Sequence, residues 1–224
     1  MIRSTGYVCL LILIPCCLAG GCAKLRPVGE FSQNVIDYFS GNTPIRAVAR
    51  MEDRYFPDER RQGINRLADR DFGRRPPYTD RYAHIAQYDS DYLVRATAIR
   101  ALNRARANEH TAVFVKALGD SSPLVRQEAA KALANMPDPD AVAGLVQLVN
   151  NTEEARDVRI AAADALKHYR RVDVARALAA TLRGRDFGVS WQSRRSLIAM
   201  TGQDLRYDES KWLEYLSGSQ SPFG

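Results

Sequence analysis

Apolar positions along most of the chain recur with the period of an α-helix and not with the alternation of a β-strand. Within residues 94–102, Val94, Ala98 and Leu102 lie four residues apart, which places them on one face of a helix. The same order of residues returns after 31, 33 and 31 residues, at 125–133, at 158–166 and more weakly at 189–197, and a degenerate earlier copy lies at 59–67. Recurrence at this interval predicts a repeat protein in which each helical unit needs its neighbours to complete the core.

A second amphipathic helix is expected before each of the four later copies, within residues 82–87, 111–118, 141–149 and 172–182. Turn residues separate the paired helices. At Ser122-Pro123 they predict a helix that starts with a capping Ser and a first-turn Pro. We therefore assign the repeats to residues 56–200. The remaining assignments are capping helices at 31–55 (within 31–39 and 44–55), a capping helix at 201–217 with Trp212, Leu213 and Leu216 facing inward, and a flexible tail at 218–224.

The repeated Asp…Val-Arg…Ala…Ala-Leu order resembles HEAT and HEAT-like repeats over roughly residues 55–200. This resemblance implies an all-α fold, a right-handed α-solenoid of about five HEAT-like helical hairpins with helical caps. The turn at 201–204, followed by Tyr207-Asp208 and a helix with a Trp, is similar to the end of HEAT-repeat lipoproteins from Planctomycetes-type bacteria.

Residues 1–21 have the pattern of a bacterial export signal, with Arg3 followed by a short apolar core and then small residues. The apolar run is shorter than the roughly 20 residues of a membrane-spanning helix, and no second run is expected to cross a membrane. Residues 18–22, Leu-Ala-Gly-Gly-Cys, resemble the lipobox of bacterial lipoproteins. That resemblance implies cleavage between Gly21 and Cys22, a diacylglycerol on the Cys22 thiol, and usually an acyl chain such as palmitate on the new amino group.

Cys22 would then begin a tether at residues 22–30 that holds the protein in the bacterial cell envelope, facing the periplasm. Ala23 is not the Asp that keeps many such lipoproteins at the inner membrane, so the resemblance favours the outer membrane. The alternative is an ordinary secretory signal cut near Ala19, which would leave the Cys22 thiol free.

The four cysteines all lie in the first 22 residues, and the three histidines are far apart in the sequence. The repeats are therefore not expected to hold a disulfide framework, a metal site or a Cys nucleophile. The net charge of +6 is spread along the chain and aromatic residues are few, which argues against nucleic-acid binding. Asp-Phe-Gly occurs at 71–73 and 186–188 without the other kinase motifs, so both copies are predicted to be turns. We expect no catalytic site, cofactor or metal.

Arg95, Arg126 and Arg159 occupy one register of the repeat, and Asp89 and Asp120 each lie six residues before an Arg. One interpretation is a basic row for an anionic ligand. We favour a structural ladder in which the carboxylates bond across the turn to the next helix, because a ligand row would not need an acid with each base. A denser group of arginines at 60–75 alternates with acids and is predicted to be a solvated, salt-bridged face.

The polar side of the second helices carries mixed charges, which favours a protein or peptide ligand over phosphate or a sulfated polysaccharide. Its candidate binding residues are Arg100, Arg104, Lys131, Asn135, Asp164, His168 and Arg195. The sequence thus favours a lipid-anchored, non-catalytic envelope scaffold that binds an unidentified protein. Two alternatives stay open: an accessory factor related to the HEAT-like phycobilin lyases, and a structural lipoprotein that binds the cell wall.

Overall fold

The computed structural model describes residues 43–218 and 223, which fall within one compact unit. The expected signal at 1–21, the tether at 22–30 and the helix within 31–39 lie outside the described residues, as does most of the expected tail. Every regular element in the described part of the chain is a helix, and that part contains no strand. The prediction of an all-α fold is confirmed.

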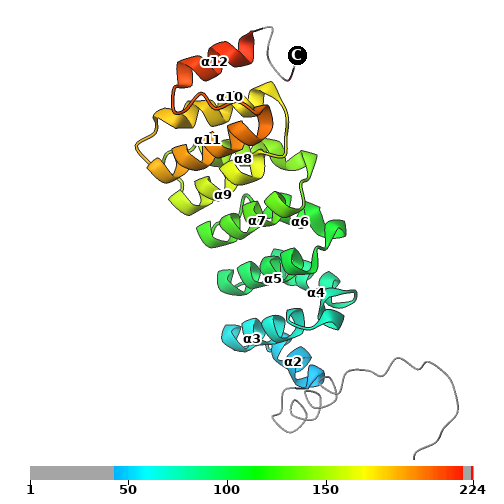
Figure 1. Ribbon diagram of the computed structural model, residues 1–224. Helices are drawn as coiled ribbons and strands as arrows, with labels where there is room; N and C mark the ends of the chain where they lie inside the picture. Colours follow the sequence, from blue (N-terminus) through cyan, green and yellow to red (C-terminus); the bar gives the residue numbers. More distant parts are fainter. Residues whose placement is uncertain (1–42, 219–222, 224) are drawn as a thin grey trace, which may run out of the picture. The chain divides into compact units, whose positions relative to one another are not determined.

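Five helical hairpins follow one another along the chain (Figure 1). They are α2 (Pro44–Met51) with α3 (Pro57–Ala68), α4 (Tyr78–Tyr88) with α5 (Tyr92–Ala105), α6 (Thr111–Ala117) with α7 (Pro123–Asn135), α8 (Val142–Asn150) with α9 (Arg156–Leu166), and α10 (Val172–Ala180) with α11 (Phe187–Thr201). A last helix, α12 (Glu209–Ser217), follows them. Short 3-10 turns are inserted as η1 (Asp71–Arg74), η2 (Asn108–His110), η3 (Pro139–Ala141) and η4 (Thr181–Arg183).

The second helices of the hairpins, α3, α5, α7, α9 and α11, lie side by side in one layer, and the first helices lie in the other (Figure 1). Each second helix packs extensively against the second helix of the next hairpin, whereas consecutive first helices contact each other much less. The layer of second helices is therefore the more closely packed one. Its solvent-facing side, which we call the second-helix surface, runs without interruption from one hairpin to the next.

The recurring apolar face forms the core of this array. Val94, Ala98 and Leu102 are fully buried. The matching residues of the next two copies are buried as well, namely Val125, Ala129, Leu133, Val158, Ala162 and Leu166. The small Ala side chains let neighbouring helices approach closely while Val and Leu fill the space between them, which gives the dense packing that a protein interior requires. In the fourth copy a fully buried Ser193 takes the place of the Ala.

The helix α2 lies within residues 44–55, which were assigned to a cap, and it packs against α3. Gly63 explains how the two helices fit together. A Cβ atom on Gly63 would lie 2.3 Å from the backbone nitrogen of Met51, so only glycine permits this contact between the two backbones.

Two expectations need correction. In α12, Trp212 and Leu216 are buried but Leu213 is 36% exposed, because residues adjacent in sequence point in different directions around a helix. Pro123 does begin α7, yet the Ser122 side chain makes no capping hydrogen bond. The carboxylate of Asp120 accepts instead from the Ser122 backbone N–H at 2.8 Å.

Candidate functional site

Three arginines on the second helices each reach forward to the turn of the next hairpin. Arg60 donates from Nε and Nη2 to the two carboxylate oxygens of Asp89, at 2.8 and 2.9 Å. Arg95 binds Asp120 in the same way, at 2.8 and 2.7 Å, and Arg126 binds Glu154 at 2.8 and 2.7 Å. Two parallel N–H···O bonds between a guanidinium and a carboxylate give the strongest and most directional ion pair available to these side chains. We call these three pairs the clamps.

The third donor of each clamp arginine holds the turn that precedes its own helix. Nη1 of Arg95 donates to the carbonyl oxygen of Asp89 at 2.9 Å, and Nη1 of Arg126 donates to that of Asp120 at 2.7 Å. Arg60 uses the carbonyl of Asp53 at 3.1 Å. Each arginine therefore joins two consecutive turns. An Asp six residues before an Arg therefore bonds to that Arg through its backbone carbonyl. Its carboxylate binds the clamp arginine of the preceding hairpin.

The clamps differ in three ways from the ladder expected from the sequence. Arg126 pairs with Glu154 rather than with a turn Asp. Arg60, which we assigned to a solvated face, is a clamp residue whose side chain is only 12% exposed; its alignment with Arg95 was the available signal. Arg159 forms no clamp, because the next hairpin's Asp186 pairs with Arg156, and the Nε of Arg159 donates to the carbonyl of Val149 at 3.2 Å.

The clamps shift the protonation equilibria of their partners. Burial alone would raise the pKa of the Asp120 carboxyl, but hydrogen bonds from Arg95 and from the Ser122 N–H hold that pKa below its usual range. Burial opposes the shift at Glu154 too, yet hydrogen bonds from Arg126 and from the Ala155 N–H lower its pKa. The hydrogen bond to Asp120 raises the pKa of Arg95. The carboxylates are thus held in their charged form, as a structural ion pair requires.

The last hairpin replaces the clamp with a network of hydroxyl and amide groups. Ser190 stands where earlier copies have Arg, and its Oγ donates to the carbonyls of Thr181 and Asp186, at 3.0 and 3.1 Å. Thr181 and Ser193 bond each other at 2.6 Å in the buried core. Ser196 donates to the carbonyl of Ala163 at 2.7 Å, which joins α11 to α9.

Six of the seven candidate binding residues lie on the second helices, and His168 lies two residues beyond the end of α9. All are exposed except the half-buried Asp164. Most already have a polar partner from a neighbouring hairpin: Arg104 pairs with Asp69, Asn135 donates to Asn103 at 3.0 Å, and Arg100 lies 3.4 Å from Glu128. Glu128 was missed by the sequence analysis. Its side chain is only 9% exposed, and it also accepts from Lys131 at 3.1 Å.

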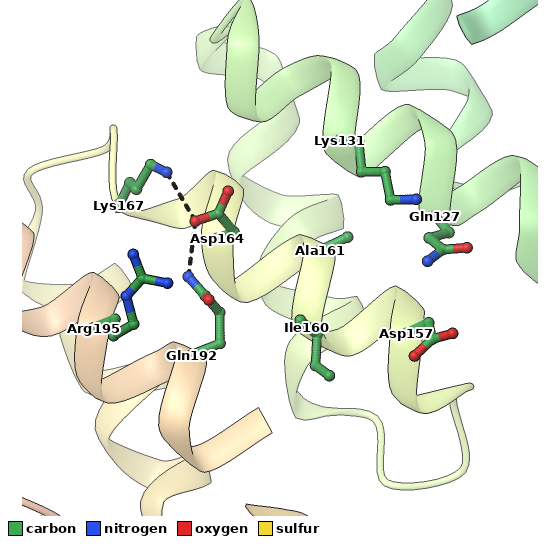
Figure 2. A pocket seen from close by; sticks show the side chains of 9 residues that line it. All are labelled: Gln127, Lys131, Asp157, Ile160, Ala161, Asp164, Lys167, Gln192 and Arg195. Atoms are coloured by element: carbon green, nitrogen blue, oxygen red, sulfur yellow. Dashed lines mark hydrogen bonds and ion pairs between the residues drawn. The ribbon is translucent and has the colours of Figure 1, made fainter. Parts of the chain in front are cut away.

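A groove of about 480 Å³ opens on this surface where α7, α9 and α11 meet (Figure 2). Its lining is Gln127, Lys131, Asp157, Ile160, Ala161, Asp164, Lys167, Gln192 and Arg195. Three of the candidates, Lys131, Asp164 and Arg195, therefore share one site, whereas the other four do not line it. The volume is within the range of sites that hold a small ligand or a few side chains of a partner.

Comparison with known proteins identifies the array. The sequence pattern described as HEAT repeats matches residues 80–167 and 111–198, which together span more than half of the chain. The chain belongs to the HEAT-repeat family. Repeats of this family typically serve as protein-binding scaffolds, because stacked hairpins present an extended surface. No curated protein matches the chain significantly.

Two solved structures are similar to this HEAT array. A crystal structure of an engineered protein has 20% sequence identity and a TM-score of 0.55, covering 70% of this chain and 79% of that chain. Human deoxyhypusine hydroxylase, determined in complex with glycerol, has 17% identity and a TM-score of 0.49, covering 73% of this chain and 75% of that chain. The likeness to the engineered protein concerns the fold.

The described residues of the HEAT array contain no group of three or more His, Cys, Asp or Glu side chains placed to hold a metal ion. His110 lies 3.1 Å from Asp80, while His84 contacts the ring of Tyr88 and His168 is exposed. The first Asp-Phe-Gly segment forms most of the turn η1. The second is not a turn as expected, because Asp186 caps α11 and Phe187 and Gly188 are the first two residues of that helix. Of the helices in residues 43–218, none has the length and hydropathy to span a bilayer.

Proposed function

We propose that this HEAT-repeat protein is a non-catalytic scaffold of the bacterial cell envelope, anchored by lipid at Cys22, that binds another protein through its second-helix surface. The groove between α7, α9 and α11 is the observation that carries the proposal. Charged side chains from three consecutive hairpins line this groove, and such multi-hairpin sites are how repeat arrays recognise partners.

The anchoring half of the proposal rests on the resemblance of residues 18–22 to a lipobox. A diacylglycerol together with an amino-terminal acyl chain such as palmitate would hold the protein stably, because two or more chains anchor where one does not. Residues 23–42 separate Cys22 from the described array, and 20 residues can span at most about 70 Å. A segment of this length allows the array to meet a partner some distance from the membrane. The residue after Cys22 is Ala23, which favours the outer membrane over the inner membrane.

Metabolic labelling with a palmitate analogue tests the anchor. The wild-type protein should incorporate the label and partition with membranes, and Cys22→Ser should do neither. Cys16→Ser, a cysteine inside the signal, is the matched control and should be labelled like the wild type. A Cys22→Ser protein of mature size that still partitions with membranes would exclude lipid anchoring at this residue.

Site-specific photocrosslinking in the native bacterium tests the scaffold. A crosslinker at Arg100, Lys131 or Arg195 should trap one protein partner, whereas a crosslinker at Lys116, exposed on α6 in the other layer, should not. The charge reversals Arg100→Glu, Lys131→Glu and Arg195→Glu, combined in one chain, should keep the helical circular dichroism and lose the crosslink. Crosslinks to peptidoglycan instead of protein would support the cell-wall alternative, and equal trapping from Lys116 would place the binding surface elsewhere.

A further inference from the structure

The groove lies at a break in a row of polar contacts between consecutive second helices. Arg100 of α5 pairs across the junction with Glu128 of α7, and Asp164 of α9 accepts from Gln192 of α11 at 2.8 Å. Glu128 and Gln192 occupy the same place in the repeat, three residues after the buried valines Val125 and Val189. At these two junctions the side chain at this place reaches back to the preceding helix and fills the space between the helices.

At the junction between α7 and α9 the same place holds Ala161, three residues after Val158. A methyl group is too short to reach Lys131 and cannot form an ion pair. Lys131 pairs instead with Glu128 on its own helix, at 3.1 Å. No polar pair of this row joins α7 to α9 in the described part of the chain, and the space that a Glu or Gln would occupy is part of the groove, with Ala161 in its lining.

The groove is lined by three basic side chains and two acidic ones. Lys131 lies on α7, Lys167 directly follows α9, and Arg195 lies on α11. Asp164 is already engaged, because it accepts hydrogen bonds from Lys167 and from Gln192, both at 2.8 Å (Figure 2). The Arg195 guanidinium stacks on the ring of Trp191, 4.7 Å from its centroid, and has no carboxylate partner among the described residues.

The remaining acid of the groove, Asp157, lies in the first turn of α9, beside Gln127 and away from Arg195 (Figure 2). A negative side chain in the first turn is stabilised by the helix dipole. Arg195 lies at the other end of the groove, whereas Lys131 lies beside Gln127 and already has one carboxylate partner, Glu128 (Figure 2). Ile160 adds an apolar wall between the two ends.

We propose that this groove binds an acidic segment of the protein partner, with one carboxylate of the segment taking the position left empty at Ala161. Lys131 and Arg195 recognise the negative charge, and Ile160 contacts an apolar side chain next to it. The inference rests on the proposed scaffold function and specifies the chemistry of its partner. A carboxylate of the partner would thus supply, between α7 and α9, the polar contact that Glu128 and Gln192 supply at the neighbouring junctions.

The decisive variant is Ala161→Glu, which supplies the missing carboxylate from the array itself. The Glu128 side chain shows that a glutamate fits this place in α7. The probe is a random peptide library displayed on phage and selected on the detergent-solubilised full chain. We expect the selected peptides to be rich in Asp and Glu beside apolar residues, and a synthetic peptide of the selected sequence to bind Ala161→Glu about tenfold more weakly or worse.

Three further variants separate charge from shape and folding. Ala161→Gln fills the same space without charge and should weaken binding less than Ala161→Glu. Ala143→Glu makes the same chemical change at an exposed residue of α8 and should bind like the wild type. If Ala161→Glu loses its helical circular dichroism, Arg195→Glu serves in its place, because Arg195 is exposed and its replacement should spare the fold. Its expected loss is also about tenfold.

Several outcomes would overturn the inference. They are selection of basic or neutral peptides, no enrichment at all, or equal binding of the acidic peptide to the wild type and Ala161→Glu. These results can be distinguished from a failure of the proposed function, which is binding of a partner protein to the second-helix surface. If photocrosslinking traps a partner equally in the wild type and in Ala161→Glu, the scaffold stands and the acidic segment does not. If Cys22 is not lipidated but the acidic peptide behaves as expected, the groove stands and the anchor does not.

Discussion

The junctions at the two ends of the array use the same core pattern but different polar contacts. From α3 to the turn before α9, each junction is joined by a bidentate Arg–carboxylate clamp. Between α9 and α11 the buried contacts are hydrogen bonds of Gln192 and Ser196, beside an exposed ion pair of Arg156 with Asp186. The apolar face therefore sets the stacking of the hairpins, while the polar contacts between them can be exchanged as long as each buried group finds a partner.

The position of the change is informative. A clamp needs a carboxylate from the turn of a following hairpin, and no hairpin follows α11 in the described chain. Ser190 donates instead to two carbonyls of its own hairpin, and the carboxylate in the turn after α11, Asp204, accepts from Nε and Nη2 of Arg194.

The largest effect is expected for Arg126→Ala, which breaks a clamp. It leaves the Glu154 carboxylate, whose side chain is only 5% exposed, without its cation. Loss of one partner of such a pair costs about 3 kcal/mol, and we expect the free energy of unfolding in urea to fall by about that amount. Arg126→Lys keeps the charge but not the two parallel bonds and should recover part of the loss. Unchanged stability of Arg126→Ala would contradict a structural role.

The clamps should also make the array sensitive to acid. The pKa values of Asp120 and Glu154 are lower in the folded chain than in the unfolded one. Their contribution is therefore complete above the unfolded values, near pH 4, and is lost as the pH falls through the lower folded values. Urea titrations between pH 6 and pH 2 should show this loss. Arg126→Ala should show a smaller decrease, and an identical pH profile would argue against the Glu154 clamp.

Arg159→Ala sharpens the comparison, because Arg159 shares the register of Arg126 but forms no clamp. It donates one hydrogen bond to the carbonyl of Val149 at 3.2 Å. Loss of a single bond of this kind costs about 1 kcal/mol, well below the effect of Arg126→Ala in the same urea assay. Equal losses for the two variants would mean that the position of the arginine in the repeat, and not its ion pair, determines how much it stabilises the fold.

The smallest effect is expected for Ser193→Ala in the last hairpin. The matching residues of the two preceding copies, Ala129 and Ala162, are already alanines, so the side chain fits. Thr181 keeps its hydrogen bond to the carbonyl of Leu178 at 2.7 Å when Ser193 is replaced. We expect a loss of about 1 kcal/mol or less in the free energy of unfolding. A loss as large as that of Arg126→Ala would show that the hydroxyl network is as important as a clamp.

The sequence predicted the helices and their stacking because the recurring Val, Ala and Leu positions respond to burial alone. It also indicated the register of the arginines. It could not assign their partners, since Asp89 and Asp120 each contribute a carboxylate to one residue and a carbonyl to another. Glu154 escaped notice because it lies five residues before Arg159, whereas Asp89 and Asp120 lie six residues before Arg95 and Arg126.

The groove was beyond sequence reasoning for a different reason. Lys131, Asp164 and Arg195 were identified as exposed positions of one row, but nothing in the row marks where it is hollow. The hollow depends on Ala161, a small residue on the buried edge of α9 that looks like any other alanine of the core. The effect of Ala161 is recognised only by comparison with Glu128 and Gln192, which occupy the same place in the repeat and bond across the neighbouring junctions.

The clamps also determine the order in which the chain can acquire its structure during synthesis. Their partners lie 29, 25 and 28 residues apart, and in every case the guanidinium precedes the carboxylate. A nascent hairpin is therefore secured as soon as the next turn has emerged, without any segment from the distant end of the polypeptide. Such short sequence separation favours rapid folding that advances from the amino terminus. The last hairpin differs: Ser190 bonds to carbonyls four and nine residues before it, and α12 then packs against α10.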